Sequence, residues 1–133
     1  MSGSGLPGDP WILTTPLGTS RFEMHRDEDK QVLHCQVGTT WLHYHLRALD
    51  DLHAMLVAHG DWMELGNKDE KADTKPGTVE HWGRSADNPV GGWYGIRKGY
   101  RGRFASYVTP VLERLGKVEF DKQGRGVWVR AKA

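Results

Sequence analysis

Three consecutive stretches of the chain alternate between apolar and polar side chains. They span residues 20–26, 31–37 and 40–46, and short connectors join them at 27–30 and 38–39. A period of two places every second side chain on the same face of a β-strand, and short connectors are typical of antiparallel neighbours. The pattern therefore predicts an antiparallel β-meander with one buried face and one exposed face.

The region after the meander predicts helices, a short strand and a long loop. Residues 49–59 repeat leucines at helical spacing, and Gly60 follows as a helix terminator. The segments that follow are predicted to be a short strand at 61–65, an exposed loop at 67–75, and a short helix at 78–84 with Thr78 as its cap.

The C-terminal third predicts a helix followed by a β-hairpin. Apolar residues recur with a helical period across residues 103–115, but Pro110 interrupts the pattern. Because proline has no backbone N–H and clashes with the preceding turn, we expect either a kink or two short helices, with Pro110 in a first turn. Residues 117–121 and 126–131 alternate around a turn that contains Gly124, which indicates a hairpin packed against the helix.

The charged residues are divided unevenly along the chain. Residues 88–133 contain ten Lys and Arg against three Asp and Glu, a net charge of +7, whereas residues 1–87 carry −6. Within the basic half, residues 93–104 alternate cations with aromatic residues and glycines, and no acid lies between Asp87 and Glu113. Cations neutralise phosphates and flat rings stack on bases. The segment predicts a nucleic-acid-binding surface, and the alternative is a face that balances the acidic half or packs its rings into the core.

Residues 111–120 and 123–130 read as a helix that ends in Leu-Gly and leads into a hairpin with Gly and Arg at its tip. This arrangement resembles the end of a winged-helix DNA-binding domain, where a recognition helix precedes a two-stranded wing. The resemblance implies an α+β fold in which the N-terminal meander packs against a winged-helix-like C-terminal half. The whole chain also looks similar to small uncharacterised bacterial proteins that share a passage like residues 88–95, a likeness that implies no function.

The combined prediction is a nucleic-acid-binding protein that uses the basic segment, the C-terminal helix and the wing. Trp93, Tyr94 and Tyr100 would stack on bases if single strands or flipped bases are bound. The candidate contacts are Arg97 and Lys98 along the backbone, Arg101 and Arg103 at phosphates or base edges, and Lys122 and Arg125 at the wing tip.

A small-molecule or peptide binder is the first alternative, and a dimeric adaptor is another. The binder would use an aromatic pocket, whereas in the adaptor the acidic and basic halves would meet between two copies of the chain. The pocket would be built from Trp41, Trp62, Trp82 and Trp93, and its stacking residues would be Trp82, Trp93, Tyr94 and Tyr100.

A histidine-dependent enzyme or a metal site is the remaining alternative. His43 and His45 project from the same strand face, and His25 or His34 could join them from neighbouring strands. A solvent-facing sheet surface explains the same alternation without a metal. We therefore predict neither a metal nor a cofactor, and Cys35, on the apolar face of its strand, should be a buried hydrophobic residue.

Length and composition predict one compact domain. The chain of 133 residues is long enough for one hydrophobic core, which we place in residues 10–133 after a flexible leader or expression remnant at 1–9. A single cysteine, the absence of a signal peptide and the absence of a membrane-spanning apolar run favour a cytoplasmic protein without a membrane partner. The expected subdivision is a meander plus helix at 10–66, the exposed loop at 67–75, and the basic winged-helix-like half at 76–133.

Overall fold

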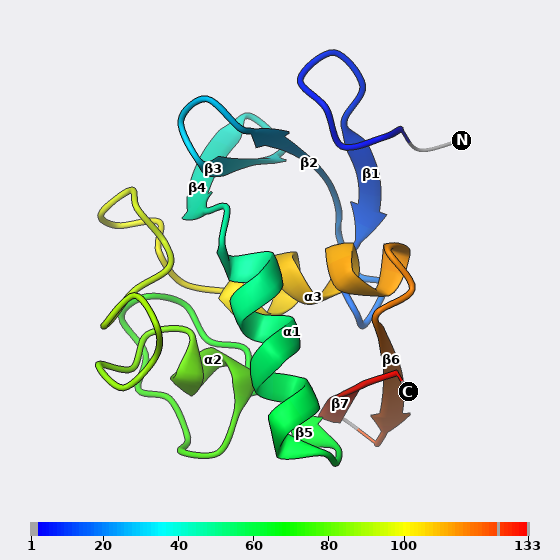
Figure 1. Ribbon diagram of the computed structural model, residues 1–133, viewed down its shortest axis with the longest axis vertical. Coiled ribbons are helices and arrows are strands. Elements are labelled where there is room, and N and C mark those ends of the chain that lie inside the picture. Colours follow the sequence, from blue (N-terminus) through cyan, green and yellow to red (C-terminus); the bar gives the residue numbers. More distant parts are fainter. Residues whose placement is uncertain (1–2, 125, 133) are drawn as a thin grey trace.

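The computed structural model describes residues 3–124 and 126–132, and the described chain forms two antiparallel sheets and three helices (Figure 1). The predicted meander is confirmed as β2 (Arg21–Asp27), β3 (Val32–Val37) and β4 (Thr40–His45). The strand β1 (Trp11–Thr14), which the alternation did not predict, pairs with β2 and completes the order β1-β2-β3-β4. The α+β class is therefore confirmed.

The remaining elements follow in the predicted order. They are α1 (Ala48–His59), β5 (Met63–Glu64), α2 (Val79–Trp82), α3 (Phe104–Arg114), β6 (Val118–Gln123) and β7 (Gly126–Ala131). The hairpin β6–β7 pairs with β5 and not with the meander, so the second sheet has the order β5-β7-β6. In Figure 1 the meander lies above, the second sheet lies below, and α3 crosses between them. None of the described helices is long and apolar enough to cross a membrane.

The helix α3 forms the centre of the core. Its first nine residues are all buried. The apolar face of the meander packs on it through Phe22, whose ring centre lies 5.0 Å from that of Tyr107, and through Tyr44, 6.0 Å from Phe104. The elements α1, α2 and β6 also contact α3. The helix therefore offers no exposed side chain before its last residues.

Pro110 lies inside one continuous helix. It is the seventh residue of α3, so the prediction of two short helices with Pro110 in a first turn is wrong. In an α-helix the N–H of residue 110 would donate to the carbonyl of Ser106. Because proline has no N–H, this hydrogen bond is missing. An interior proline costs about 3 kcal/mol. The burial of nine consecutive residues offsets that cost and keeps the helix whole.

Candidate functional site

The basic segment, residues 93–104, runs along the edge of the meander. Gly95 forms an antiparallel bridge with Tyr44 of β4, and hydrogen bonds on either side of that bridge join the two backbones. Further along, the buried Tyr44 hydroxyl donates to the Gly102 carbonyl at 2.9 Å. The segment is therefore attached to β4 at two points, and the residues between them form a loop.

Glu70, in the loop 67–75, fixes that loop of the basic segment. Its carboxylate accepts the Gly99 N–H and both the backbone N–H and the Nε–H of Arg101, at 2.8 to 3.1 Å. These bonds, above all the one from the Arg101 guanidinium, lower the pKa of Glu70 to about 2. Arg101 was predicted to contact nucleic acid, but its half-buried guanidinium is paired with Glu70. It anchors two loops to one another.

A second carboxylate, Glu80 of α2, lies at the start of α3. Glu80 is fully buried and accepts the N–H groups of Phe104 and Ala105 at 3.2 and 2.9 Å. Arg103 occupies the N-cap position of α3 in the left-handed conformation, with φ of 58°, and makes no side-chain cap. Glu80 therefore caps α3 from another helix. Burial raises the pKa of Glu80, although the hydrogen bonds from Ala105 and Arg84 oppose this shift.

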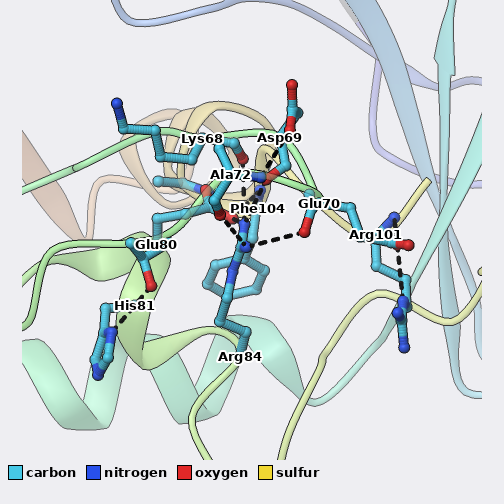
Figure 2. A network of polar contacts seen from close by, with 12 residues as sticks. Lys68, Asp69, Glu70, Ala72, Glu80, His81, Arg84, Arg101 and Phe104 are labelled. Atoms are coloured by element: carbon cyan, nitrogen blue, oxygen red, sulfur yellow. Dashed lines mark hydrogen bonds and ion pairs between the residues drawn. The ribbon is translucent and has the colours of Figure 1, made fainter. Parts of the chain in front are cut away.

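Arg84 connects Glu80 to the loop 67–75, as Figure 2 shows. Its guanidinium donates to the Glu80 carboxylate at 2.8 Å and to the carbonyl oxygens of Lys68, Asp69 and Ala72 at 3.1 to 3.2 Å. The loop contains no helix or strand, as predicted. Its backbone is nevertheless held against α2, because one buried cation binds several of its carbonyl groups.

Most rings of the predicted stacking set are packed inside the protein. Trp93 contacts the guanidinium groups of Arg84 and Arg101, which lie 4.3 and 4.4 Å from its ring centre. Tyr94 is fully buried and stacks on the half-buried Trp82 at 5.2 Å. Of the four rings in this set, Tyr100 is the one classed as exposed. Trp93, Tyr94 and Trp82 therefore act mainly in packing.

The four tryptophans considered for an aromatic pocket have different surroundings. Trp41 lies on the outer face of the meander, near the rings of His25 and His34. Trp62 lies under the Arg130 guanidinium, 4.4 Å from its ring centre. Trp82 and Trp93 have the neighbours given above. These contacts do not bring the four rings to one pocket wall.

Arg97 contacts two residues that have exposed aromatic rings. Trp41 is 38% exposed and Tyr100 is 42% exposed. The Arg97 guanidinium donates to the Trp41 carbonyl at 2.7 Å and lies 4.0 Å from the centre of the Tyr100 ring. Ile96 and Lys98, the chain neighbours of Arg97, are exposed too. We call these five residues the Trp41–Tyr100 surface.

Trp41 was expected in a pocket and not on this surface. Its position in the alternation carried a signal, because it shares the polar side of its strand with His43 and His45. A tryptophan among polar residues on the solvent side of a meander has an exposed ring. The hydrogen bond from Arg97 to the Trp41 carbonyl had no local signal, since the two residues are 56 positions apart in the chain.

Three histidines form a row across the same outer face. His25 on β2 is aligned with His34 on β3, and His34 with His43 on β4. The Nδ1 atoms of His34 and His43 are 2.8 Å apart, and His34 Nε2 lies 3.1 Å from the Asp27 carboxylate. Burial and the charge of His34 lower the pKa of both His25 and His43. Protonation of His25 and of His43 is therefore disfavoured in the folded protein.

The geometry gives no support to a metal site at His43 and His45. His45 is aligned with Val32, outside the histidine row. Within residues 3–124 and 126–132, no three His, Cys, Asp or Glu side chains are placed to hold a metal ion. Cys35 is buried as predicted, and burial raises the pKa of its thiol, which keeps it protonated at neutral pH.

The six cations predicted to contact nucleic acid are spread over several environments. In Figure 1 the turn between β6 and β7 lies at lower right, whereas the yellow chain that precedes α3 lies at left. The exposed Lys122 belongs to that turn region, and Arg125 lies outside the described residues. Arg103 lines a cavity between the meander and the C-terminal half. Arg97 and Lys98 remain together, on the Trp41–Tyr100 surface.

Asn88 closes the turn-rich passage that leads into the basic segment. Its buried side chain donates to the carbonyl oxygens of Trp82 and Gly92 at 2.7 and 2.8 Å, and its Oδ1 accepts the N–H groups of Val90 and Gly92. An amide side chain has two donor hydrogens and one acceptor oxygen, so every polar atom of Asn88 is used. The passage 88–95 therefore has a structural role.

Residues 3–132 match the sequence profile of a family of unknown function, DUF6855. The match covers nearly the whole chain, which therefore belongs to this family. No curated protein and no solved structure matches the chain. The comparisons thus identify no winged-helix domain, and they agree with the likeness of the whole chain to small uncharacterised proteins.

Proposed function

We propose that this member of the DUF6855 family binds single-stranded nucleic acid through the Trp41–Tyr100 surface. One observation carries the proposal: the exposed Arg97 guanidinium lies over the exposed Tyr100 ring and is hydrogen-bonded to the backbone carbonyl of Trp41, a residue whose own ring is exposed. Proteins that bind single strands combine rings, on which bases stack, with cations that neutralise the backbone phosphates. Lys98 adds a second exposed cation beside the first.

The surface is also held in place before any ligand arrives. Glu70 binds the backbone on both sides of Tyr100, through the N–H groups of Gly99 and Arg101. Trp41 is part of a strand that is paired along its length. A surface that is already ordered loses less conformational entropy when it binds, which supports a useful affinity from few contacts.

We also propose that the C-terminal half is winged-helix-like. The order α1-β5-α2-α3-β6-β7, with the hairpin completing a sheet around β7, supports this relation. In the winged-helix family the helix before the wing enters a DNA groove. The burial of the first nine residues of α3 leaves no face for that contact. This burial favours a single strand on the Trp41–Tyr100 surface over a duplex bound by α3.

Anisotropy titration of a labelled oligothymidine tests the proposal. We expect binding by the parent protein to weaken steeply between about 50 mM and about 200 mM salt, because phosphate contacts release counterions. The double variant Trp41→Ala/Tyr100→Ala should bind at least about tenfold more weakly, since each stacked base contributes about 1–3 kcal/mol. Arg97→Ser/Lys98→Ser should also weaken binding and should reduce its salt dependence.

The matched control removes two exposed cations from elsewhere, Lys117 and Lys132. The variant Lys117→Ser/Lys132→Ser carries the same net charge as Arg97→Ser/Lys98→Ser. It should bind the oligomer almost as well as the parent protein, and circular dichroism should show that all variants fold. Equal affinities for the two charge variants would mean that the binding is non-specific, and the proposed surface would then be wrong.

A further inference from the structure

A cavity separates the meander from the C-terminal half. Its volume is about 600 Å³, and its walls come from the β1–β2 turn, from the chain after β5, from the start of α3 and from β7. Cavities of roughly 300–1,000 Å³ are the usual size for small-molecule sites. This cavity lies between two separate sheets, in a part of the molecule that the Trp41–Tyr100 surface does not include.

The cavity is lined by polar groups that have no partner inside the described protein. The oxygen Oδ1 of Asn67 is buried and accepts no hydrogen bond. The walls also carry the guanidinium of Arg103, the ammonium of Lys68, and the hydroxyls of Ser106 and Tyr107. None of these four groups has a hydrogen-bond or ion-pair partner among the described residues. Ser106 and Tyr107 are buried, and buried polar groups usually have partners, so their two unpaired hydroxyls beside the exposed cations Arg103 and Lys68 indicate a ligand.

Arg103 is placed at this wall by a strained backbone. Its φ of 58° lies in the left-handed region, which residues other than glycine seldom adopt and which stores strain. The Arg103 N–H donates to the Lys68 carbonyl at 2.8 Å, so the two cationic residues are tied together where both line the cavity. Strain of this kind is often found where a side chain must reach a ligand.

The charges at the wall favour an anion. Glu64 is the one acid among the lining residues, and its carboxylate accepts a hydrogen bond from the Lys75 ammonium at 3.3 Å. Arg103 and Lys68 have no such acidic partner in the described chain. Burial raises the pKa of Tyr107, so its hydroxyl is protonated at neutral pH and can donate a hydrogen bond. Four groups at the wall can therefore donate hydrogen bonds to the ligand.

We propose that this cavity is a binding site for a small organic phosphate. Arg103 and Lys68 would hold the phosphate, because a guanidinium fork and an ammonium suit its oxygens. Ser106 and Tyr107 would donate to the same oxygens or to their neighbours. The cavity volume of about 600 Å³ leaves room for an organic group beside the phosphate. The proposal is independent of the single-strand surface, with which it shares no residue.

Thermal shift and isothermal titration with four probes test the proposal. The probes are inorganic phosphate, ribose 5-phosphate, adenosine monophosphate and citrate. We expect ribose 5-phosphate or adenosine monophosphate to raise the melting temperature in proportion to its concentration, because a ligand that binds the folded state alone stabilises it. Inorganic phosphate should bind more weakly, since it fills only a small part of the cavity. Tightest binding by citrate would mean that the site selects carboxylates, and the phosphate assignment would be wrong.

Arg103→Gly is the informative variant. Glycine adopts the observed φ without strain, so the variant removes the guanidinium and leaves the fold intact. It should weaken the binding of the phosphate probe about tenfold or more, as the loss of a charged hydrogen bond does. Lys68→Ala should also weaken it, whereas Lys117→Ala, an exposed cation outside the cavity, should leave it unchanged.

Two further results would overturn the proposal. One is that none of the four probes binds the parent protein. The other is that Arg103→Gly binds the phosphate probe as tightly as the parent protein does. The variant Trp41→Ala/Tyr100→Ala separates the two proposed sites, because it should lose oligothymidine binding and keep the affinity for the small phosphate. A failure at one site therefore leaves the result at the other interpretable.

Discussion

Replacing Glu80 with alanine should destabilise the protein more than any surface change of the same kind. The Glu80 side chain is 1% exposed, and its carboxylate caps α3 and pairs with Arg84. The variant leaves two buried N–H groups without an acceptor, at about 1–3 kcal/mol each. It also removes the acidic partner of a buried guanidinium, which costs about 3–5 kcal/mol where a pair is broken. Because Arg84 keeps its carbonyl acceptors, we expect a total loss of about 4 kcal/mol.

Glu80→Gln and Glu119→Ala are the matched comparisons. Glutamine keeps the shape and one acceptor oxygen, and burial already raises the pKa of Glu80, so the neutral side chain should cost only about 1–2 kcal/mol. Glu119 pairs with Arg130 at 3.0 Å, but these side chains are 38% and 45% exposed. Removing the carboxylate of such an exposed pair should cost about 0–1 kcal/mol.

Urea denaturation, followed by tryptophan fluorescence, gives the free energy of unfolding for each variant. The expected order of stability is parent, Glu119→Ala, Glu80→Gln and then Glu80→Ala. A loss below about 1 kcal/mol in Glu80→Ala would refute the reasoning, because water or a rearranged Arg84 would then satisfy the start of α3. If Glu80→Ala and Glu80→Gln lost the same free energy of unfolding, the loss would come from the charge of Glu80 alone. The claim that its hydrogen bonds to the start of α3 stabilise the protein would then be wrong.

Three further outcomes are expected. Asn88→Asp keeps the acceptor oxygen but cannot donate to two partly buried carbonyl groups, so urea denaturation should show a loss of about 3 kcal/mol. Gly102→Ala would place a Cβ 2.3 Å from the backbone nitrogen of Glu70, and limited proteolysis should show faster cleavage in the displaced loop 67–75. Because the pKa of His25 and of His43 is lower in the folded state, the unfolded chain binds more protons as the pH falls below about 6.5. The melting temperature should therefore fall between pH 7.5 and pH 5.5, and this part of the loss should be absent in His25→Gln/His43→Gln.

Elements with a clear period were predictable from the sequence. The meander, α1 and the C-terminal hairpin each repeat apolar residues over six or more positions. The strand β1 has four residues with two buried side chains, which is too short for an alternation to be recognised. The prediction of α3 was wrong at Pro110, because helix propensity does not take into account the burial of nine consecutive residues.

The candidate site was less predictable, because long-range pairs decide which cations are free. Arg101 stands in an acid-free run, and the acid that binds it, Glu70, lies 31 residues earlier in the chain. The pairing of Glu80 with Arg84 has a local signal, since the two residues are one helical turn apart. The role of Glu80 at the start of α3 has no such signal. The local charge pattern therefore located the basic segment but could not show which of its cations are free to bind a ligand.

The central place of α3 has a consequence for synthesis on the ribosome. The meander leaves the ribosome first, but the residues that cover its apolar face come much later in the chain. Tyr44, for example, donates its hydroxyl to Gly102, 58 residues further on, and packs against the first residue of α3. Such distant contacts slow folding and leave apolar surface exposed in the meantime. We therefore expect the apolar face of the nascent meander to stay exposed until α3 has been synthesised, and a chain that ends before α3 to be recognised by chaperones and proteases.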